Sequence, residues 1–191
     1  LLTVPSLIAT LLNGEVVLRD QVVPGANDNL TGCAGGVLLA ERLAADLPED
    51  MELVFVATGA EEAGTGGAYR LAQAMGDEWP KDNTVIVAID GLTNGEMRYM
   101  EDGEIVRLPI PEWLEAVAAD TAASDPRFAQ VKPFQIPAGG SDATPFEAMG
   151  WPGIALVCID PDIGAPRHYH HPTDTPDNLD MTQFVLSVDY I

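Results

Sequence analysis

The chain contains little positive charge, few cysteines and few histidines. It has 9 Lys and Arg against 30 Asp and Glu, a formal net charge of −21 at pH 7. Such a charge repels phosphate backbones and anionic lipid headgroups, so nucleic acid is not an expected partner. Cys33 and Cys158 are too few for a disulfide framework and lack the paired spacing of a thiolate zinc site. We expect both to be buried free thiols.

The sequence also lacks an apolar run of the roughly 20 residues that a membrane-spanning helix needs. Its uncharged N-terminal run, residues 1–12, is shorter and has no basic start of the kind found in signal peptides. This run is either a strand entering the core or the tail of a membrane-spanning segment whose earlier part lies outside the chain. We therefore divide the chain into an apolar segment at 1–23 and a domain at 24–191.

Length and composition predict one globular domain. The chain has 191 residues, of which 47% are hydrophobic and 20% charged. Apolar runs alternate with helical patterns, which predicts an α/β three-layer sandwich with a mainly parallel central sheet covered by helices. The expected helices are 30–46, 66–75, 111–123 and 144–149, and the expected strands are 51–58, 84–89 and 153–159, followed by a polar loop at 160–180.

Acidic residues follow two of the expected strands, and histidines follow the third. Glu61 and Glu62 come after 51–58, and Asp90 comes after 84–89. The polar loop carries all the histidines of the chain, namely His168, His170 and His171. Open α/β sheets place their sites beyond the carboxyl ends of their strands, so these side chains are expected to converge. Oxygen and imidazole ligands without thiolate suit a hydrolytic zinc or another divalent metal.

Five sequence blocks occur in an order that resembles a known family. They are PGANDN at 24–29, GAEEAGTGGA at 59–68, ID at 89–90, GGSD at 139–142 with PF at 145–146 and GWP at 150–152, and YHHPTDT at 169–175. From residue 24 to the C-terminus the chain resembles the co-catalytic zinc aminopeptidases of the clan MH exopeptidases. The resemblance implies a zinc exopeptidase domain at 24–191 that acts on the N-termini of peptides or small proteins.

The same resemblance implies a role for each matching residue. Asp28 would bridge two zinc ions, Glu62 and His170 would complete one ion, and Asp90 would serve the other. Glu61 would be the general base, since one carboxylate of an adjacent pair can bind metal while the other takes a proton from water.

Three other residues of the polar loop, His168, His171 and Asp174, are not expected to bind the metal. His170 is preferred over His171 as the ligand because its spacing to the Asp-Thr pair at 174–175 matches the family pattern. His168 is expected at the surface. Asp174 either orients an imidazole or caps the turn that follows it.

Four residues of the fourth block and its surroundings could line a pocket for the substrate side chain: Ser141, Asp142, Phe146 and Trp151. Asp142 followed by Pro145 is equally typical of a helix start. An acidic cleft would attract a free substrate amine, which favours aminopeptidase over carboxypeptidase action.

The chain departs from the family pattern upstream of Asp28. The family has a His-x-Asp motif there, but no histidine precedes Asp28 in this chain. If Leu11 and Asn13 occupy that place, the site would hold one zinc ion or none. Alternatively the motif lies further upstream, beyond a membrane-spanning insertion, and the chain is the soluble part of a membrane-associated or extracytoplasmic protein.

Two other functions remain open at this point. A relative of the family performs glutaminyl cyclisation on a single zinc, and Glu62, Asp28 or Asp90 with His170 could hold such an ion. A catalytically degenerate domain that binds a metal or a partner protein is the third interpretation, and the missing His-x-Asp motif favours it.

Overall fold

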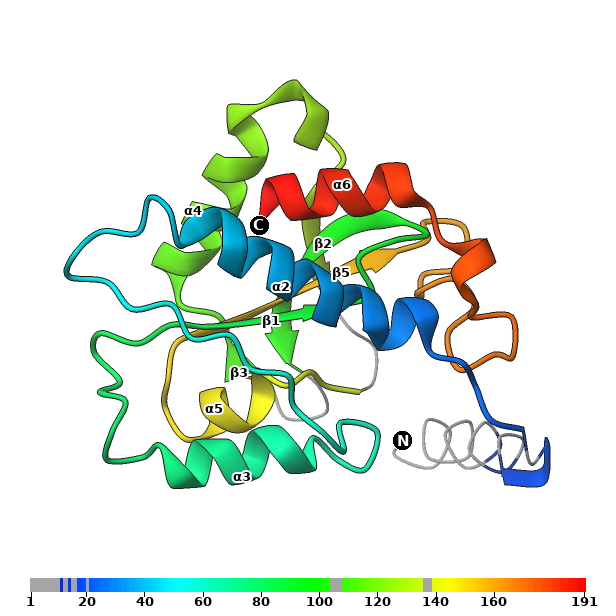
Figure 1. Cartoon of the computed structure of the whole chain (residues 1–191), viewed down its shortest axis with the longest axis horizontal. Coiled ribbons are helices and arrows are strands. Elements are labelled where there is room, and N and C mark those ends of the chain that lie inside the picture. Colours follow the sequence, from blue (N-terminus) through cyan, green and yellow to red (C-terminus); the bar gives the residue numbers. More distant parts are fainter. Residues whose placement is uncertain (1–10, 12–13, 15–16, 20, 104–107, 136–138) are drawn as a thin grey trace.

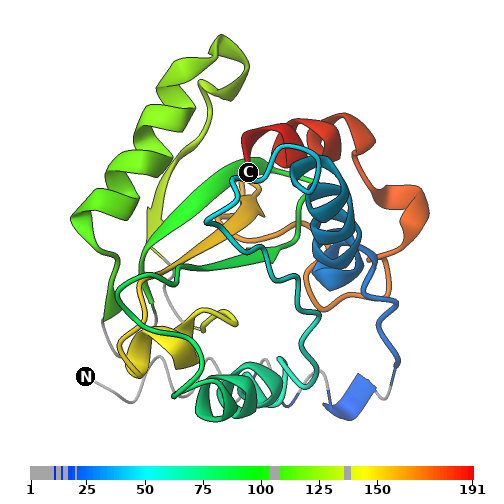
Figure 2. The same ribbon diagram turned by 60° about the vertical axis from the view of Figure 1, so that its left-hand side comes forward.

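The computed structural model describes residues 11, 14, 17–19, 21–103, 108–135 and 139–191. A central sheet lies between two layers of helices, which confirms the α/β class (Figures 1 and 2). Its strands are β1 (Ile86–Asp90), β2 (Glu96–Gly103), β3 (Leu108–Pro109), β4 (Lys132–Gln135) and β5 (Gly153–Ile159). The order is β1-β5-β2-β3, with β4 also paired to β2. The pairs β1–β5 and β2–β4 are parallel, and β2–β5 and β2–β3 are antiparallel.

Strand β5 occupies the interior of the sheet and is buried along its whole length. Because successive side chains of a strand point to opposite faces, the residues of β5 pack into two hydrophobic clusters, one on each face of the sheet. Ile154, Leu156 and Cys158 pack with α4 (Glu112–Ser124) and α6 (Met181–Tyr190). Ala155, Val157 and Ile159 join a second cluster on the other face. This double burial explains the continuous apolar run from which the strand was predicted.

Four of the helices lie where the sequence predicts them. They are α2 (Gly32–Leu43), α3 (Gly66–Ala74), α4 and α5 (Thr144–Ala148). In both views α2 and α6 cover one side of the sheet, whereas α3 and α5 lie on the other (Figures 1 and 2). The sequence did not predict α6, β2, β3 or β4. Among the described residues, shorter helical turns also occur at Ala26–Thr31, Pro126–Phe128 and Pro176–Asn178.

The expectation for the two cysteines is half right. Cys158 is buried, but Cys33 is exposed. Helix α2 packs through glycines, because a Cβ on Gly35 would lie 2.4 Å from Leu92 and a Cβ on Gly36 would lie 2.1 Å from the Phe55 ring. The glycine face therefore takes the buried position, and Cys33 points outward.

The prediction of a strand at 51–58 is wrong. No strand is assigned there, and Leu53, Val54, Phe55 and Val56 are each between 41% and 48% exposed. Within this segment only the Met51 amide has a backbone acceptor among the described residues. The neighbouring strand β1 pairs with β5 alone in the described sheet. An apolar run without a hydrogen-bonded neighbour forms no ladder, whatever its composition.

The apolar segment at the N-terminus lies mostly outside the described residues. Leu11 is described and is 64% exposed, whereas Asn13 is not described. In the described part of the chain, none of the helices combines the length and the apolar character that crossing a membrane requires.

Candidate metal centre

Four chain segments bring acidic and imidazole side chains to the carboxyl end of β1. Asp28 lies in the turn before α2, Glu62 in the loop before α3, and Asp90 is the last residue of β1. His170 lies in the loop after β5, the parallel neighbour of β1. The predicted convergence therefore occurs, although the segment that delivers Glu61 and Glu62 is not a strand.

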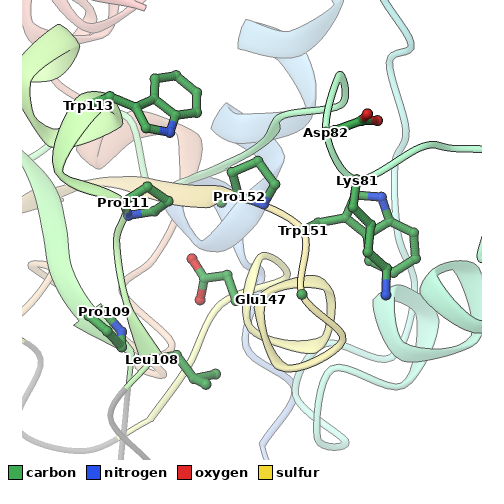
Figure 3. Close-up of a pocket in the computed structure, with 11 residues that line it drawn as sticks. Lys81, Asp82, Leu108, Pro109, Pro111, Trp113, Glu147, Trp151 and Pro152 are labelled. Atoms are coloured by element: carbon green, nitrogen blue, oxygen red, sulfur yellow. The ribbon is translucent and has the colours of Figure 1, made fainter.

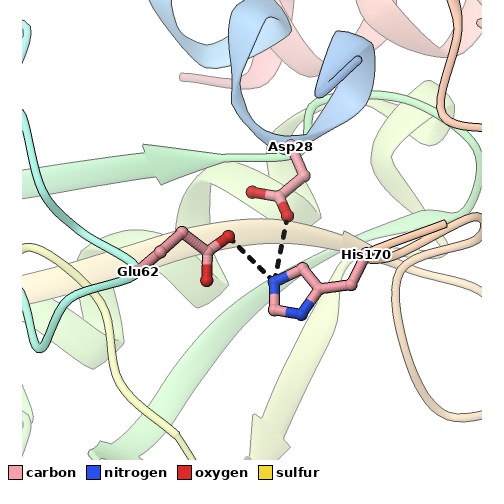
Figure 4. A group of neighbouring side chains, drawn as sticks. All are labelled: Asp28, Glu62 and His170. Atoms are coloured by element: carbon pink, nitrogen blue, oxygen red, sulfur yellow. Dashed lines mark hydrogen bonds and ion pairs between the residues drawn. The ribbon is translucent and has the colours of Figure 1, made fainter. Parts of the chain in front are cut away.

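Asp28, Glu62 and His170 form a group that could hold a metal ion. His170 Nε2 lies 2.8 Å from Glu62 Oε1 and 3.5 Å from Asp28 Oδ2 (Figure 4). One ligand atom from each residue lies within 4.8 Å of the other two. One imidazole nitrogen and two carboxylates form a donor set that zinc uses in proteins.

The electrostatics of this group also suit a cation. Burial, reinforced by the charge of Glu62, raises the pKa of Asp28 to about 6. Burial raises the pKa of Asp90 to about 7, with further contributions from Asp28 and Glu61. The pKa of Glu61 also rises to about 7, through burial and then through Glu62. The carboxylates thus repel one another, and a divalent cation would relieve that repulsion.

Glu62 and His170 form the paired part of the group. Their hydrogen bond lowers the pKa of the Glu62 carboxyl and raises the pKa of the His170 imidazole. A metal ion at this position would replace the shared proton, because a ligating imidazole must be neutral at its donor nitrogen.

The structure brings His170, rather than the other two histidines, to the carboxylates. His171 is exposed, and its Nδ1 lies 3.4 Å from Arg19 Nη1. His168 Nδ1 lies 2.8 Å from the hydroxyl of Thr173. The ligand roles assigned to Asp28, Glu62, Asp90 and His170, and the base role of Glu61, stay predictions.

Neither expectation for Asp174 is correct. Asp174 is 1% exposed, and among the described residues no hydrogen bond joins its carboxylate to an imidazole. Its two carboxylate oxygens instead accept the backbone N–H groups of Asn27 and Asp28, at 2.8 Å and 3.1 Å. Both carboxylate oxygens of Asp174 therefore bind the loop that carries Asp28.

Tyr169 is a residue of the site that the sequence did not single out. Its ring stacks on the His170 imidazole with centroids 3.8 Å apart. Burial raises the pKa of its hydroxyl, and the charges of Glu62, Asp28 and other carboxylates add to the effect. The hydroxyl therefore stays a hydrogen-bond donor beside the carboxylates. Its place next to His170 in the sequence was the available signal.

The four residues predicted to line a substrate pocket are divided between two environments. Asp142 accepts a hydrogen bond from the Thr58 hydroxyl and contributes to the raised pKa values of Glu61 and Asp90. Ser141 is buried next to it and accepts the Ala143 amide at 3.2 Å.

Phe146 and Trp151 instead pack in a core cluster with Ala68 and Ala72 of α3. Trp151 also lines a pocket of about 510 Å³ at the start of β5 (Figure 3). Since a strand rises about 3.3 Å per residue, that end lies about 20 Å from the carboxyl end of β5. A substrate-binding role for these four residues stays a prediction.

Comparison with known proteins gives consistent matches. The chain is 30% identical to the alkaline phosphatase isozyme conversion protein of Escherichia coli over a region of 110 residues. This region makes up 58% of this chain and 30% of that protein. The fold matches BSAP, a zinc aminopeptidase from Bacillus subtilis, with a TM-score of 0.69 and 23% identity over 88% of this chain and 42% of the other. It also matches a glutaminyl cyclase of Bacteroides thetaiotaomicron, with a TM-score of 0.60 and 16% identity over 88% and 63% of the two chains.

The chain thus spans less than half the length of the first two proteins. The family model described as Peptidase family M28 matches residues 13–190, nearly the whole sequence. Zinc is the metal expected of such peptidases, and the cluster of Asp28, Glu62 and His170 suits it. On this match, the chain belongs to Peptidase family M28.

Proposed function

We propose that the chain is the catalytic domain of a zinc-dependent aminopeptidase that hydrolyses N-terminal peptide bonds. The observation that carries the proposal is the convergence of Asp28, Glu62 and His170 within 4.8 Å beside the separate carboxylate of Glu61. Membership of Peptidase family M28 and the fold shared with a zinc aminopeptidase support it.

The described residues offer ligands for more than one ion. Asp28, Glu62 and His170 would hold one zinc, and Asp28 with Asp90 would hold a second. When bound, zinc supplies a Lewis acid that stabilises developing negative charge and lowers the pKa of coordinated water. The carboxylates fit this role because burial, and then the charge of their neighbours, raises their pKa values, and a cation would favour their ionised forms.

Glu61 is the residue placed to move protons. In the metal-free protein the pKa of its carboxyl is about 7, through burial and then through the charge of Glu62. Glutamate is one of the residue types that serve as general bases. Glu61 would take a proton from the attacking water and deliver it to the leaving amine. Glu62 is engaged with His170 at 2.8 Å, so the two adjacent glutamates have different tasks.

Tyr169 would complete the reaction site as a hydrogen-bond donor. Its hydroxyl keeps its proton because burial, and then the charges of the neighbouring carboxylates, raise its pKa. Such a donor stabilises the carbonyl oxygen of the peptide as that oxygen becomes negative during attack. The stacking of its ring on His170 fixes the hydroxyl relative to the metal ligands.

The acidic character of the site favours substrates with a free α-amine. The net charge of −21 and the carboxylates at the centre attract a peptide N-terminus. Peptides or small-protein N-termini are therefore the proposed substrates. Association with a membrane stays a prediction.

The test uses the zinc-loaded 191-residue chain, an aminoacyl anilide with a free α-amine, and the same anilide with its amine acetylated. We expect the free-amine substrate to be cleaved and the acetylated one to be resistant. The substitution Glu61→Gln should lower the cleavage rate by about 10²–10⁴-fold without changing zinc content. Glu78→Gln, an exposed control, should leave the rate unchanged. Full activity of Glu61→Gln, or equal cleavage of both substrates, would contradict the proposal.

A cyclase is the second candidate, because the fold also matches a glutaminyl cyclase. The same zinc-loaded chain would then convert an N-terminal Gln peptide to its cyclised form without releasing anilide. If the chain binds zinc but performs neither reaction, a binding domain is favoured instead.

A further inference from the structure

We propose that Asp174 is a positioning residue that fixes the metal ligand Asp28 relative to the metal ligand His170. The inference rests on the proposed metal site but not on the reaction performed there. Three consecutive backbone amides donate to this one residue. Ala26 N lies 3.2 Å from Asp174 O, Asn27 N lies 2.8 Å from Oδ1, and Asp28 N lies 3.1 Å from Oδ2.

The other end of the connection is the loop that carries His170. Asp174 follows His170 by four residues, and its own amide donates to His171 O at 2.9 Å. The backbone between the imidazole and the carboxylate is therefore closed into a turn. A displacement of the Asp174 carboxylate would move Asp28 relative to the imidazole that lies 3.5 Å from it.

A different residue ties the Asp28 loop to the sheet. Asn29 Nδ2 donates to Ile89 O at 2.9 Å, and Asn29 Oδ1 accepts the Gly91 amide at 3.1 Å. Asn29 thus sets the loop relative to Asp90, and Asp174 sets it relative to His170. Asn27 Oδ1 adds a further contact with the segment after β1, since it accepts the Thr93 amide at 3.0 Å.

The chemistry of the contact requires a carboxylate. Asp174 is 1% exposed, so each of its oxygens depends on the N–H groups that it accepts. Hydrogen bonds from backbone amides to an ionised acceptor are about twice as strong as neutral ones. An asparagine offers one oxygen and an NH₂ group, so one of the two amides would face another donor.

The test compares zinc affinity, measured by competition with a coloured chelator, for the wild type, Asp174→Asn and Asp125→Asn. Asp125 is the control, since its carboxylate accepts the Arg127 amide at 2.9 Å at the start of Pro126–Phe128, outside the loop that carries His170. We expect Asp174→Asn to raise the zinc Kd by about 10–100-fold, as loss of groups that orient metal ligands does. Asp125→Asn should leave the zinc Kd within about twofold.

An unchanged Kd in folded Asp174→Asn would overturn the proposal, and so would an equal rise in both variants. If Asp174→Asn does not fold, hydrogen exchange on the metal-free wild type decides. The amides of Asn27 and Asp28 should exchange slowly without metal, because Asp174 holds them, and rapid exchange in the folded protein would refute the role. None of these readouts depends on peptidase activity, so failure of the proposed reaction is distinguishable from failure of this inference.

Discussion

Removing the carboxylate of Asp90 should stabilise the metal-free protein at alkaline pH. Asp90 has a pKa of about 7 in the folded protein, against an ordinary value of 3.8. Below pH 4 the group is protonated in both states and contributes no penalty. As the pH rises from 4 to 7 the unfolded chain releases the proton first, so the penalty on the folded state grows, and it stays constant above pH 7.

The magnitude follows from the difference between the two pKa values. At about 1.4 kcal/mol per pKa unit, an increase of about three units corresponds to about 4 kcal/mol. Neighbouring carboxylates share this protonation, so about 2–4 kcal/mol is the expected gain for Asp90→Asn at pH 8. The Asp90 carboxylate has no hydrogen bond to another described residue, and the substitution therefore loses none.

The assay is urea unfolding in the presence of a chelator at pH 4 and pH 8. Asp90→Asn should raise the free energy of unfolding at pH 8 and change it by less than about 1 kcal/mol at pH 4. The exposed control Asp46→Asn should show no such dependence on pH. A gain of equal size at both pH values, or none at pH 8, would refute the argument that burial and neighbouring charge penalise the ionised Asp90 in the folded protein.

Two further substitutions test individual residues of the site. His170→Ala should weaken zinc binding by at least about 100-fold, because it removes the one nitrogen donor of the cluster of Asp28, Glu62 and His170. His171→Ala should leave the zinc Kd nearly unchanged. Equal effects of the two substitutions in a chelator competition would contradict the choice of His170 as the ligand. Tyr169→Phe should lower kcat by about 100-fold with little change in KM, as measured by steady-state kinetics. The control Tyr69→Phe, which alters a similarly exposed tyrosine on α3, should leave kcat unchanged. An unchanged kcat for Tyr169→Phe would exclude the donor role of its hydroxyl.

Strand β5 could be predicted to the residue because both of its faces are buried, so the whole run from Gly153 to Ile159 is apolar. Strand β2 could not, because Glu96 and Arg98 give it a polar appearance. Arg98 is nevertheless buried, and its guanidinium donates to the carbonyl oxygens of Met97 and Gln130. Gln130 is distant in the sequence, so the local pattern holds no sign of that contact.

The same distinction applies to the metal centre. The order of the motifs was sufficient to select Asp28, Glu62 and His170, which the fold brings within reach of one ion. The tasks of Asp174 and Tyr169 depend on which atoms they meet across the fold. From the sequence alone, an Asp that accepts two backbone amides some 146 residues away cannot be distinguished from an Asp that caps a nearby turn.

The exposed apolar side chains of residues 51–58 have a consequence for behaviour in concentrated solution. Val85 beside β1 and Val87 on β1 are also exposed, and β1 pairs on one side in the described sheet. Such edges promote association between copies. At low ionic strength the charge of −21 on each molecule opposes that association, but the screening length falls to about 3 Å in 1 M salt. We therefore expect the acidic composition to oppose association between copies at low salt and to lose that effect at high salt.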